Sequence, residues 1–245
     1  MANENRQMHD RCATWYQRKP DLPLDVAHYG PDIGDESDLR LLGEVRGRRV
    51  LELGCGSAPA SISFAKQGAI ALAVESSDEL AAFARRRCEQ EGVRVELRQG
   101  DLADLAFIRA DSVDIVFSAY ALAYVEDLSR VFRQVHRVLK VGAPLVFSLP
   151  HPFYDIIDED GNQPLLVRRS YFDRTSIGSE DEDLTESRQH HTIADLYTVL
   201  FRASYRVDAM LEPQPETSGP RSSLWREPFR YVPRTLVIRA RKEGN

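Results

Sequence analysis

The sequence predicts a doubly wound α/β fold around a mainly parallel sheet. Between residues 49 and 149, short apolar runs typical of buried strands alternate with amphipathic helical segments. Their order is strand, helix, strand, helix, strand, strand, helix, strand. This order requires parallel strands covered on both faces by right-handed crossovers. In such a sheet, ligands bind at the carboxyl ends of the strands, near the first one.

The individual elements follow from apolar periodicity and from turn formers at their ends. Pro59 stands in the first turn of a helix, where its missing N–H costs nothing, and Gly68 stands past the end of that helix. Ser76 precedes Glu79 by three residues, the spacing of a capping box at a helix start. The expected strands are residues 50–53, 70–74, 93–97, 113–117, 144–149, 205–211 and 235–240, and the expected helices are residues 58–66, 76–91, 128–139 and 192–203.

Length and composition limit the class of protein. The 245 residues suit one large α/β domain, and 42% hydrophobic with 29% charged residues is typical of a globular protein. The formal net charge of −6 provides no general basic field for a phosphate backbone, so we expect no nucleic-acid partner. The chain has neither an apolar run of about 18 residues nor a signal peptide, so we expect no membrane association.

The cysteines indicate a reducing environment. Cys12, Cys55 and Cys88 are far apart, and they form neither a disulfide framework nor a Cys-x-x-Cys metal motif. We therefore expect a cytoplasmic protein. The sequence leaves the assembly open between a monomer and a homodimer.

Two less regular segments flank the regular part of the chain. Residues 1–46 are polar and interrupted by prolines, and we expect an N-terminal cap there. Residues 47–245 form the main domain. Within it, residues 151–190 are rich in charge and turn formers, which indicates an insertion that covers the ligand site. We expect both segments to move over that site, and the acidic run 180–183 to be a solvated loop.

The first expected strand runs into a glycine turn, Glu52-Leu53-Gly54-Cys55-Gly56-Ser57-Ala58. Glycines at 54 and 56 let the backbone turn sharply and approach a ligand closely. The helix that follows offers its N-terminus to a carboxylate. A strand-to-helix turn without a ligand is the alternative.

The next three strand ends also carry polar signals. Glu75 lies about 20 residues beyond the glycines, where a carboxylate can accept both hydroxyls of a ribose. Asp101, after Gly100, can accept from an exocyclic adenine amine. The fourth strand enters a loop of small residues at Ser118-Ala119-Tyr120. The alternatives are an exposed glutamate, a turn or N-cap aspartate, and a plain buried strand.

Taken together, these motifs resemble those of the class I S-adenosylmethionine (SAM)-dependent methyltransferases over residues 45–150. The matching stretches are VLELGCGSA, AVES, QGDLADL and DIVFSAYALAYVED, followed by LSRVFRQVHRVLKVGAPLVFSLP. The sequence departs from the family at Ala58, where the family has a glycine. The resemblance implies a seven-stranded, mostly parallel Rossmann-like sheet with an antiparallel last strand. It also implies SAM as the cofactor and S-adenosylhomocysteine as its product.

The resemblance also assigns the cofactor contacts. The Gly54–Gly56 turn would hold the amino-acid end of SAM, Glu75 the ribose, and Asp101 with Leu102 the adenine. The loop after the fourth strand would line the methyl side. The full set of expected cofactor-binding residues is Glu52, Gly54, Cys55, Gly56, Glu75, Ser76, Asp101, Leu102, Ser118, Ala119 and Tyr120.

The resemblance also implies a small-molecule acceptor over the fourth and fifth strand ends. The stretches FSLPHPF, RRSYFD and HHTIADL resemble a bacterial subgroup that methylates small molecules. His151 is the candidate general base, because histidine takes a proton near neutral pH, and a structurally held histidine is the alternative. The expected acceptor contacts are His28, Tyr29, Tyr124, Phe153 and Tyr171, although the aromatic residues also suit packing.

The remaining acceptor-side signals are weaker. Arg168-Arg169 suits an anionic acceptor, or is solvated charge of the insertion. No acidic residue directly follows the fifth strand, so we expect no metal, although Asp155 keeps this question open.

Two other functions share part of the pattern. A SAM-binding regulator without turnover has the same cofactor motifs. A nicotinamide-dependent dehydrogenase shares the glycine turn and the ribose acid, but its G-x-G-x-x-G motif would place a glycine at Pro59. It also gives no account of Gly100-Asp101.

Overall fold

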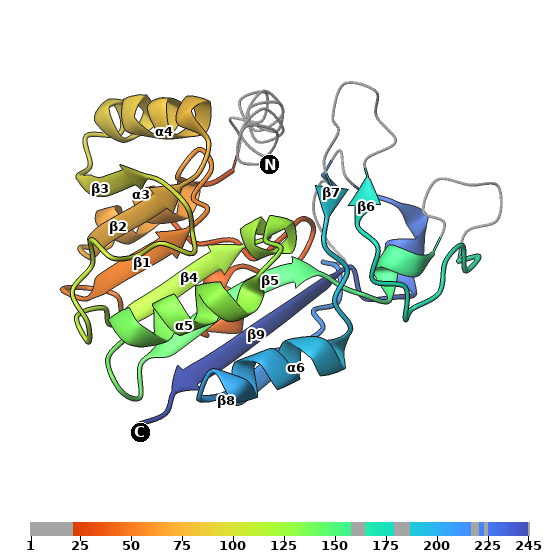
Figure 1. The fold of residues 1–245 in the computed structure, drawn as a ribbon. Helices are drawn as coiled ribbons and strands as arrows, with labels where there is room; N and C mark the ends of the chain where they lie inside the picture. The colour runs from red at the N-terminus through yellow and green to blue at the C-terminus, as the bar shows by residue number, and fades with distance from the viewer. Residues whose placement is uncertain (1–21, 158–164, 179–186, 217–220, 223–224, 245) are drawn as a thin grey trace.

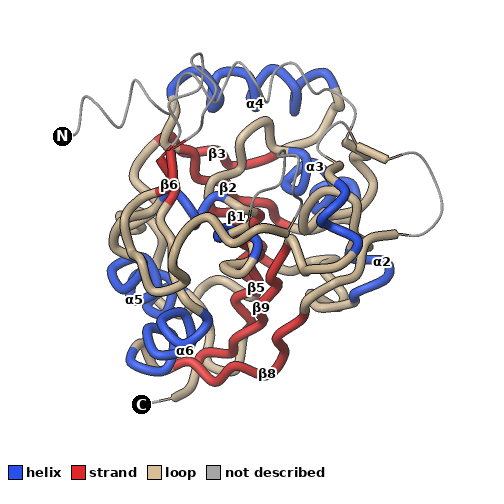
Figure 2. The backbone as a smooth tube through the Cα atoms, turned by 90° about the vertical axis from the view of Figure 1, so that its right-hand side faces the viewer, coloured by secondary structure: helices blue, strands red, loops and turns tan. Residues whose placement is uncertain are grey.

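The computed structural model describes residues 22–157, 165–178, 187–216, 221–222 and 225–244. A seven-stranded sheet forms the centre of the molecule, and a two-stranded sheet lies beside it (Figure 1). Figure 2 shows the seven-stranded sheet between two helical layers, with α5 and α6 on one side and α2 and α3 on the other. This is the predicted doubly wound α/β architecture.

The strand order of the large sheet is β3-β2-β1-β4-β5-β9-β8. Strands β1 to β5 run parallel, and β9 pairs antiparallel with both β5 and β8. This confirms the seven-stranded sheet with an antiparallel last strand. The strands are β1 Arg49–Leu53, β2 Ile70–Glu75, β3 Val95–Gln99, β4 Ile115–Ala119, β5 Pro144–Pro150, β8 Tyr205–Leu211 and β9 Thr235–Lys242, and the small sheet pairs β6 Ile177–Gly178 with β7 Ser187–Arg188.

All four predicted helices are present. The helices are α2 Glu36–Leu39, α3 Pro59–Lys66, α4 Asp78–Gln90, α5 Leu128–Val138 and α6 Ile193–Arg202, with 3-10 turns η1 Ala121–Tyr124, η2 Tyr154–Ile156 and η3 Glu227–Arg230. Strand β3 begins two residues later than predicted. The reason is the end of α4, where the Val93 amide bonds back to the Cys88 carbonyl and Gly92 takes a positive φ.

The predicted capping box at Ser76 is wrong. Ser77 is the N-cap of α4, and its hydroxyl accepts from the Leu80 amide. Helix α6 does begin with a capping box, formed by Thr192 and Asp195, which was not among the predictions. Its signal is present in the sequence as an acid three residues after a threonine.

Apolar side chains fill both faces of the sheet. Neighbouring residues of β1 alternate between the faces, so that Leu51 and Leu53 pack under α5 while Val50 packs on the α3 side. The described part of the N-terminal segment belongs to the α3-side core, to which it contributes Ala27, Tyr29, Ile33, Leu41, Leu42 and Val45. The division of the chain at residue 46 stays a prediction.

The described part of the insertion after β5 lies beyond the carboxyl ends of the parallel strands, at the right of Figure 1. Its described parts include η2 and the β6–β7 sheet. The acidic run 180–183 and Cys12 lie outside the described residues. Within the described ranges, no helix combines the length and apolar character needed to cross a membrane.

Candidate functional site

The turn after β1 depends on its two glycines. Gly54 has a φ of +67°, and a Cβ atom there would lie 2.2 Å from the Cβ of Ala121. Gly56 has a φ of +54°, and among the described residues, chain neighbours aside, no atom lies within 4 Å of a Cβ added there. The first glycine therefore permits contact between the β1 and β4 ends, and the second leaves open space at the turn.

Ala58 also adopts the left-handed conformation, with a φ of +60°. An L-residue pays roughly 1–2 kcal/mol for this geometry, and glycine does not. The geometry therefore gives a physical reason for the glycine that the resembled family has at this position. The Ala58 side chain is fully buried beside Ile62 of α3.

Glu75 connects the β2 end to this turn. Its Oε2 accepts a 2.8 Å hydrogen bond from the Gly56 amide, and its Oε1 accepts one of 2.9 Å from the Ser77 amide. The Ser76 hydroxyl lies 3.4 Å from Oε1. Glu75 is only 4% exposed. A carboxylate has about four acceptor positions, so these amides fix the group and leave capacity for a ligand hydroxyl.

The loop after β3 meets the same two segments. The Gly100 amide donates to the Glu75 carbonyl at 2.9 Å, and buried Leu102 comes within 3.6 Å of the Gly54 Cβ position. Asp101 is exposed, and its Oδ1 accepts from the Ala103 amide at 2.8 Å. The structure thus brings the three predicted cofactor motifs together at one edge of the sheet.

Glu52 and Cys55 lie beneath this edge. The Glu52 carboxylate is buried and accepts from both the amide, at 2.8 Å, and the hydroxyl of Ser61 in α3. Burial raises the Glu52 pKa to about 7 and also raises the pKa of the Cys55 thiol. Both side chains therefore contact the protein interior, and their cofactor role stays a prediction.

The three residues at the end of β4 that were predicted to line the methyl side lie in different surroundings. Ser118 is fully buried, and its hydroxyl donates to the Leu53 carbonyl at 2.9 Å, so its side chain joins β4 to β1. Ala119 is half-buried. Tyr120 has a φ of +61°, and its hydroxyl lies 2.5 Å from the Thr235 hydroxyl. A bulky residue in this conformation is unusual, and such strain clusters at functional sites.

His151 is buried and has a hydrogen-bond partner on each ring nitrogen. Its Nδ1 accepts from the Phe153 amide at 3.1 Å, so the proton of the neutral ring lies on Nε2, which donates to Glu212 at 2.9 Å. Burial lowers the His151 pKa, and the Glu212 carboxylate opposes this effect. The lone pair that a general base needs is already engaged, and the catalytic role stays a prediction.

The residues predicted to contact the acceptor lie in different parts of the structure. Tyr29 is 0% exposed, packs edge-on against Phe117 and donates to Glu36, so its prediction as an acceptor contact is corrected to a core residue. Tyr124 packs on the α5-side core, and Tyr171 packs on the α3-side core. Phe153 is 41% exposed.

His28 is half-buried, and its Nε2 has no hydrogen-bond partner among the described residues. Burial lowers the His28 pKa, which favours the neutral ring.

A polar cavity at the carboxyl end of β5 was not predicted from the sequence. Its volume is about 10 Å³, which is room for about one water-sized group. The cavity is lined by Ala123, Leu149, Pro150, Asp155, Gln189, His191 and Leu196. Most of its polar residues come from irregular segments, where no period marks an inward side. The paired histidines before the α6 capping box were the available signal.

The described part of the chain contains no group of three His, Cys, Asp or Glu residues placed to hold a metal ion. Because this search covers only the described residues, the expected absence of a metal stays a prediction.

Comparison with known proteins agrees with this geometry. Residues 51–147 match a family described as the methyltransferase domain. The chain is 31% identical over 156 residues to a ubiquinone biosynthesis O-methyltransferase of Xanthomonas axonopodis pv. citri, covering 59% of this chain and 65% of that one. It is 35% identical over 102 residues to a protein of the same name from Hahella chejuensis, covering 42% and 43%. The chain thus spans less than two thirds of these curated relatives.

A solved structure extends the likeness over most of the chain. The SAM-dependent methyltransferase of Mesorhizobium loti is 26% identical with a TM-score of 0.69, covering 83% of this chain and 94% of that one. Residues 51–147 therefore form a methyltransferase domain, and the fold of the chain is shared with a SAM-dependent methyltransferase.

Proposed function

We propose that this protein binds SAM at the carboxyl ends of β1, β2 and β3 and methylates a small molecule at the ends of β4 and β5. The observation that carries the proposal is the Glu75 carboxylate, which two backbone amides hold beside the Gly54–Gly56 turn. In this proposal Glu75 accepts the ribose hydroxyls, and the exposed Asp101 carboxylate accepts the adenine amine. Gly56 supplies the open approach to the amino-acid end.

SAM supplies a methyl group that is already activated, so the chain chiefly has to align the acceptor and exclude water. Tyr120 fits a positioning role, because its hydroxyl is held by Thr235 and its amide donates to the Ser148 carbonyl at 3.0 Å. His151 can act as a base only if Nδ1 gives up its hydrogen bond from the Phe153 amide and takes a proton from the acceptor instead. Acceptors that arrive deprotonated need no such exchange.

The names of the relatives favour one acceptor atom for a first test. Two of them are called ubiquinone biosynthesis O-methyltransferases, which supports oxygen as the atom methylated here. The cytoplasmic location stays a prediction, and so does an assembly that is either a monomer or a homodimer. Within the described residues, Cys55 and Cys88 are buried free thiols, which fits a reducing compartment.

The test is an acceptor screen scored by release of S-adenosylhomocysteine from SAM. Phenols, amines and carbon acids are compared at saturating SAM, with Asp101→Ala as a variant whose carboxylate loss leaves the core intact. We expect release with one acceptor class, and a lower rate for the variant at limiting SAM. A protein that binds SAM but releases no product with any class would instead be a SAM-binding regulator.

A further inference from the structure

Residues 187–191 run across the carboxyl ends of β4 and β5. The Gln189 amide donates to the Ala123 carbonyl at 2.7 Å, which anchors this segment on η1, directly after the β4 end. Gln189 and His191 both line the cavity at the end of β5. Arg188 therefore stands beside the place where the proposed function puts the acceptor.

Arg188 takes part in a buried cluster of charge. Its guanidinium lies 2.5 Å from Oδ1 of Asp155, a side chain that is 5% exposed. The other oxygen of Asp155 lies 3.3 Å from Nδ1 of His190, whose Nε2 donates to the Tyr171 carbonyl at 3.0 Å. Only the protonated ring can donate on both sides, and hydrogen bonding to Asp155 raises the His190 pKa.

A second guanidinium reaches the same region from β9. Arg234 precedes Thr235, whose hydroxyl holds that of Tyr120, and its guanidinium carbon lies 5.7 Å from the centre of the Tyr154 ring. The Arg234 carbonyl accepts from the His151 amide at 2.8 Å. Arg188 and Arg234 therefore contact neighbouring residues of η2, Asp155 and Tyr154.

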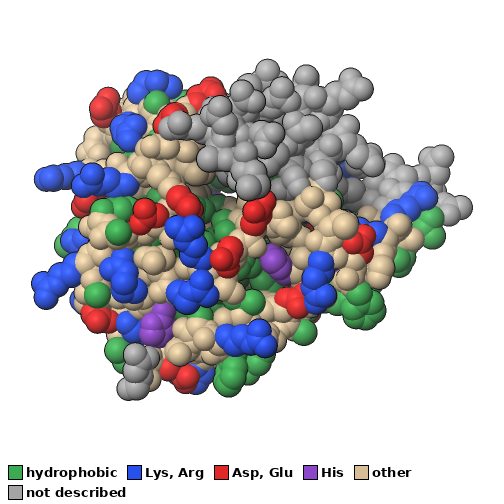
Figure 3. Space-filling model, viewed as in Figure 1, with side chains coloured by type: hydrophobic (Ala, Val, Ile, Leu, Met, Phe, Trp, Pro, Cys, Tyr) green, Lys and Arg blue, Asp and Glu red, His purple; other side chains and the backbone are tan. Residues whose placement is uncertain are grey.

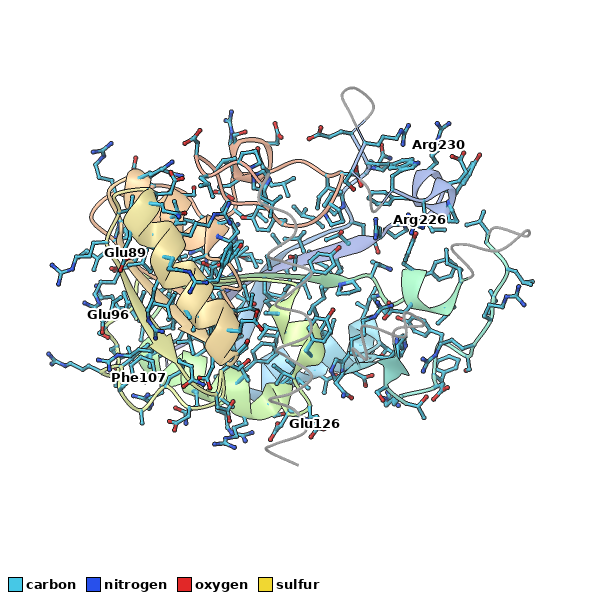
Figure 4. The ribbon with its side chains drawn as sticks, turned by 90° about the horizontal axis from the view of Figure 1, so that it is seen from above. Glu89, Glu96, Phe107, Glu126, Arg226 and Arg230 are labelled. Carbon is cyan, nitrogen blue, oxygen red and sulfur yellow. The ribbon has the colours of Figure 1, made fainter. Side chains whose placement is uncertain are left out.

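Counting only the described residues, the balance of these groups is positive in a chain whose formal net charge is −6. Arg188 and the His190 ring both contact the Asp155 carboxylate, and Arg234 contacts the neighbouring Tyr154 ring, while Glu212 lies across His151 and is 53% exposed. Arg226, the N-cap of η3, and Arg230, which pairs with Glu227 at 3.3 Å, lie at the opposite end of the molecule from Glu89 and Glu96 (Figure 4). On the face shown in Figure 3, charges of both signs are interspersed.

Two buried nitrogen atoms in this region have no hydrogen-bond partner within the described part of the chain. Nε of Arg188 and Nε2 of His191 are buried without a hydrogen bond among the described residues. Buried polar groups are almost always paired, so unpaired ones call for an explanation. A ligand oxygen between them would supply that pairing.

We propose that the methyl acceptor carries an anionic group, a carboxylate or a phosphate ester, which binds between Arg188 and Arg234 at the ends of β4 and β5. This inference rests on the proposed function, since the acceptor is located by it. Guanidinium groups suit both anions because their planar donors match two oxygens at once. The cavity at the β5 end then takes one oxygen of that group.

The test uses inorganic phosphate and acetate as separate probes, titrated at low ionic strength into protein saturated with S-adenosylhomocysteine. We expect one of them to bind at one site per chain in the millimolar range, and the stronger probe identifies the type of anion. Arg188→Gln and Arg234→Gln should each weaken binding about tenfold or more. The matched control is Arg206→Gln, whose 60% exposed side chain lies at the other end of the sheet.

Arg188→Gln leaves the buried Asp155 carboxylate with a weaker partner, so thermal unfolding is measured in parallel and Arg188→Lys is included. Arg188→Lys should keep the fold and lose only part of the anion affinity. The proposal is overturned if neither probe binds the parent, or if both glutamine variants bind as the parent does. Failure of S-adenosylhomocysteine to bind in the same samples would instead contradict the proposed function.

Discussion

The Gly56 amide donates a 2.8 Å hydrogen bond to the carboxylate of Glu75. This bond joins the turn after β1 to the end of β2, two places that lie 19 residues apart in the chain. Ser77 donates to the same carboxylate and caps α4, so the start of that helix belongs to the same unit. The proposed ribose acid is therefore also a structural residue, which changes what its removal should do.

Glu75→Ala should weaken SAM binding and also destabilise the fold. The loss of a charge-assisted hydrogen bond is worth about one to two decades of affinity. The two amides that lose their acceptor should cost about 1–3 kcal/mol of unfolding free energy. Asp101→Ala should lower only the affinity, because Asp101 is exposed and its contact is a local turn. Calorimetric titration and urea unfolding of both variants separate the two effects, and unchanged SAM affinity in both would refute these assignments.

The two glycines of the turn should respond differently to alanine. Gly56→Ala adds a Cβ in open space at a positive φ and should cost about 1–2 kcal/mol. Gly54→Ala pays the same penalty and also places its Cβ 2.2 Å from that of Ala121. Its unfolding free energy should fall by at least about 3 kcal/mol, or the protein should not fold. Equal midpoints of urea unfolding for the two variants would contradict the close approach of the β1 and β4 ends.

As the pH rises from about 4.5 to about 7, Glu52 should lower the free energy of unfolding. Burial raises its pKa from the usual 4.5 to about 7, so in this window the folded chain holds a proton that the unfolded chain has released. The contribution falls by about 1.4 kcal/mol per pH unit and is constant above the folded pKa. Glu52→Gln removes this dependence. The free energy of unfolding of the variant relative to the parent should therefore increase with pH up to about pH 7. If urea unfolding gives the same pH dependence for both proteins, Glu52 does not titrate as described.

His151→Gln tests whether the imidazole is a base or a positioning group. A base role predicts a rate loss of about 10²–10⁴ in single-turnover methyl transfer, with little change in SAM affinity. A positioning role through Phe153 and Glu212 predicts a higher KM for the acceptor with a nearly unchanged kcat. The fully bonded ring makes the second result the expected one for an acceptor that arrives deprotonated. A large loss of rate whose size depends on pH would establish the base.

The sequence predicted the elements that carry local signals. Apolar periodicity and end-marking glycines located each strand of the sheet, and Gly54, Glu75 and Asp101 do meet at one edge. These predictions succeeded because parallel strands place their carboxyl ends together, whatever connects them.

What the sequence could not supply is the direction of single side chains and the long-range pairs. Tyr29 and Ser118 were expected to face ligands, and both point into the core. The pair of Arg188 with Asp155 joins residues 33 apart, across an irregular segment without periodicity. The His151–Glu212 bond spans 61 residues and was not predictable from any local pattern.

Calorimetric titration of the whole protein with S-adenosylhomocysteine, and separately with a reduced nicotinamide dinucleotide, decides which cofactor the Gly54–Gly56 turn and Glu75 bind. We predict one S-adenosylhomocysteine site per chain, without added metal, and no binding of the dinucleotide. Binding of the dinucleotide without binding of S-adenosylhomocysteine would contradict the account, because the Gly54–Gly56 turn with Glu75 would then serve the other cofactor that such a constellation can hold.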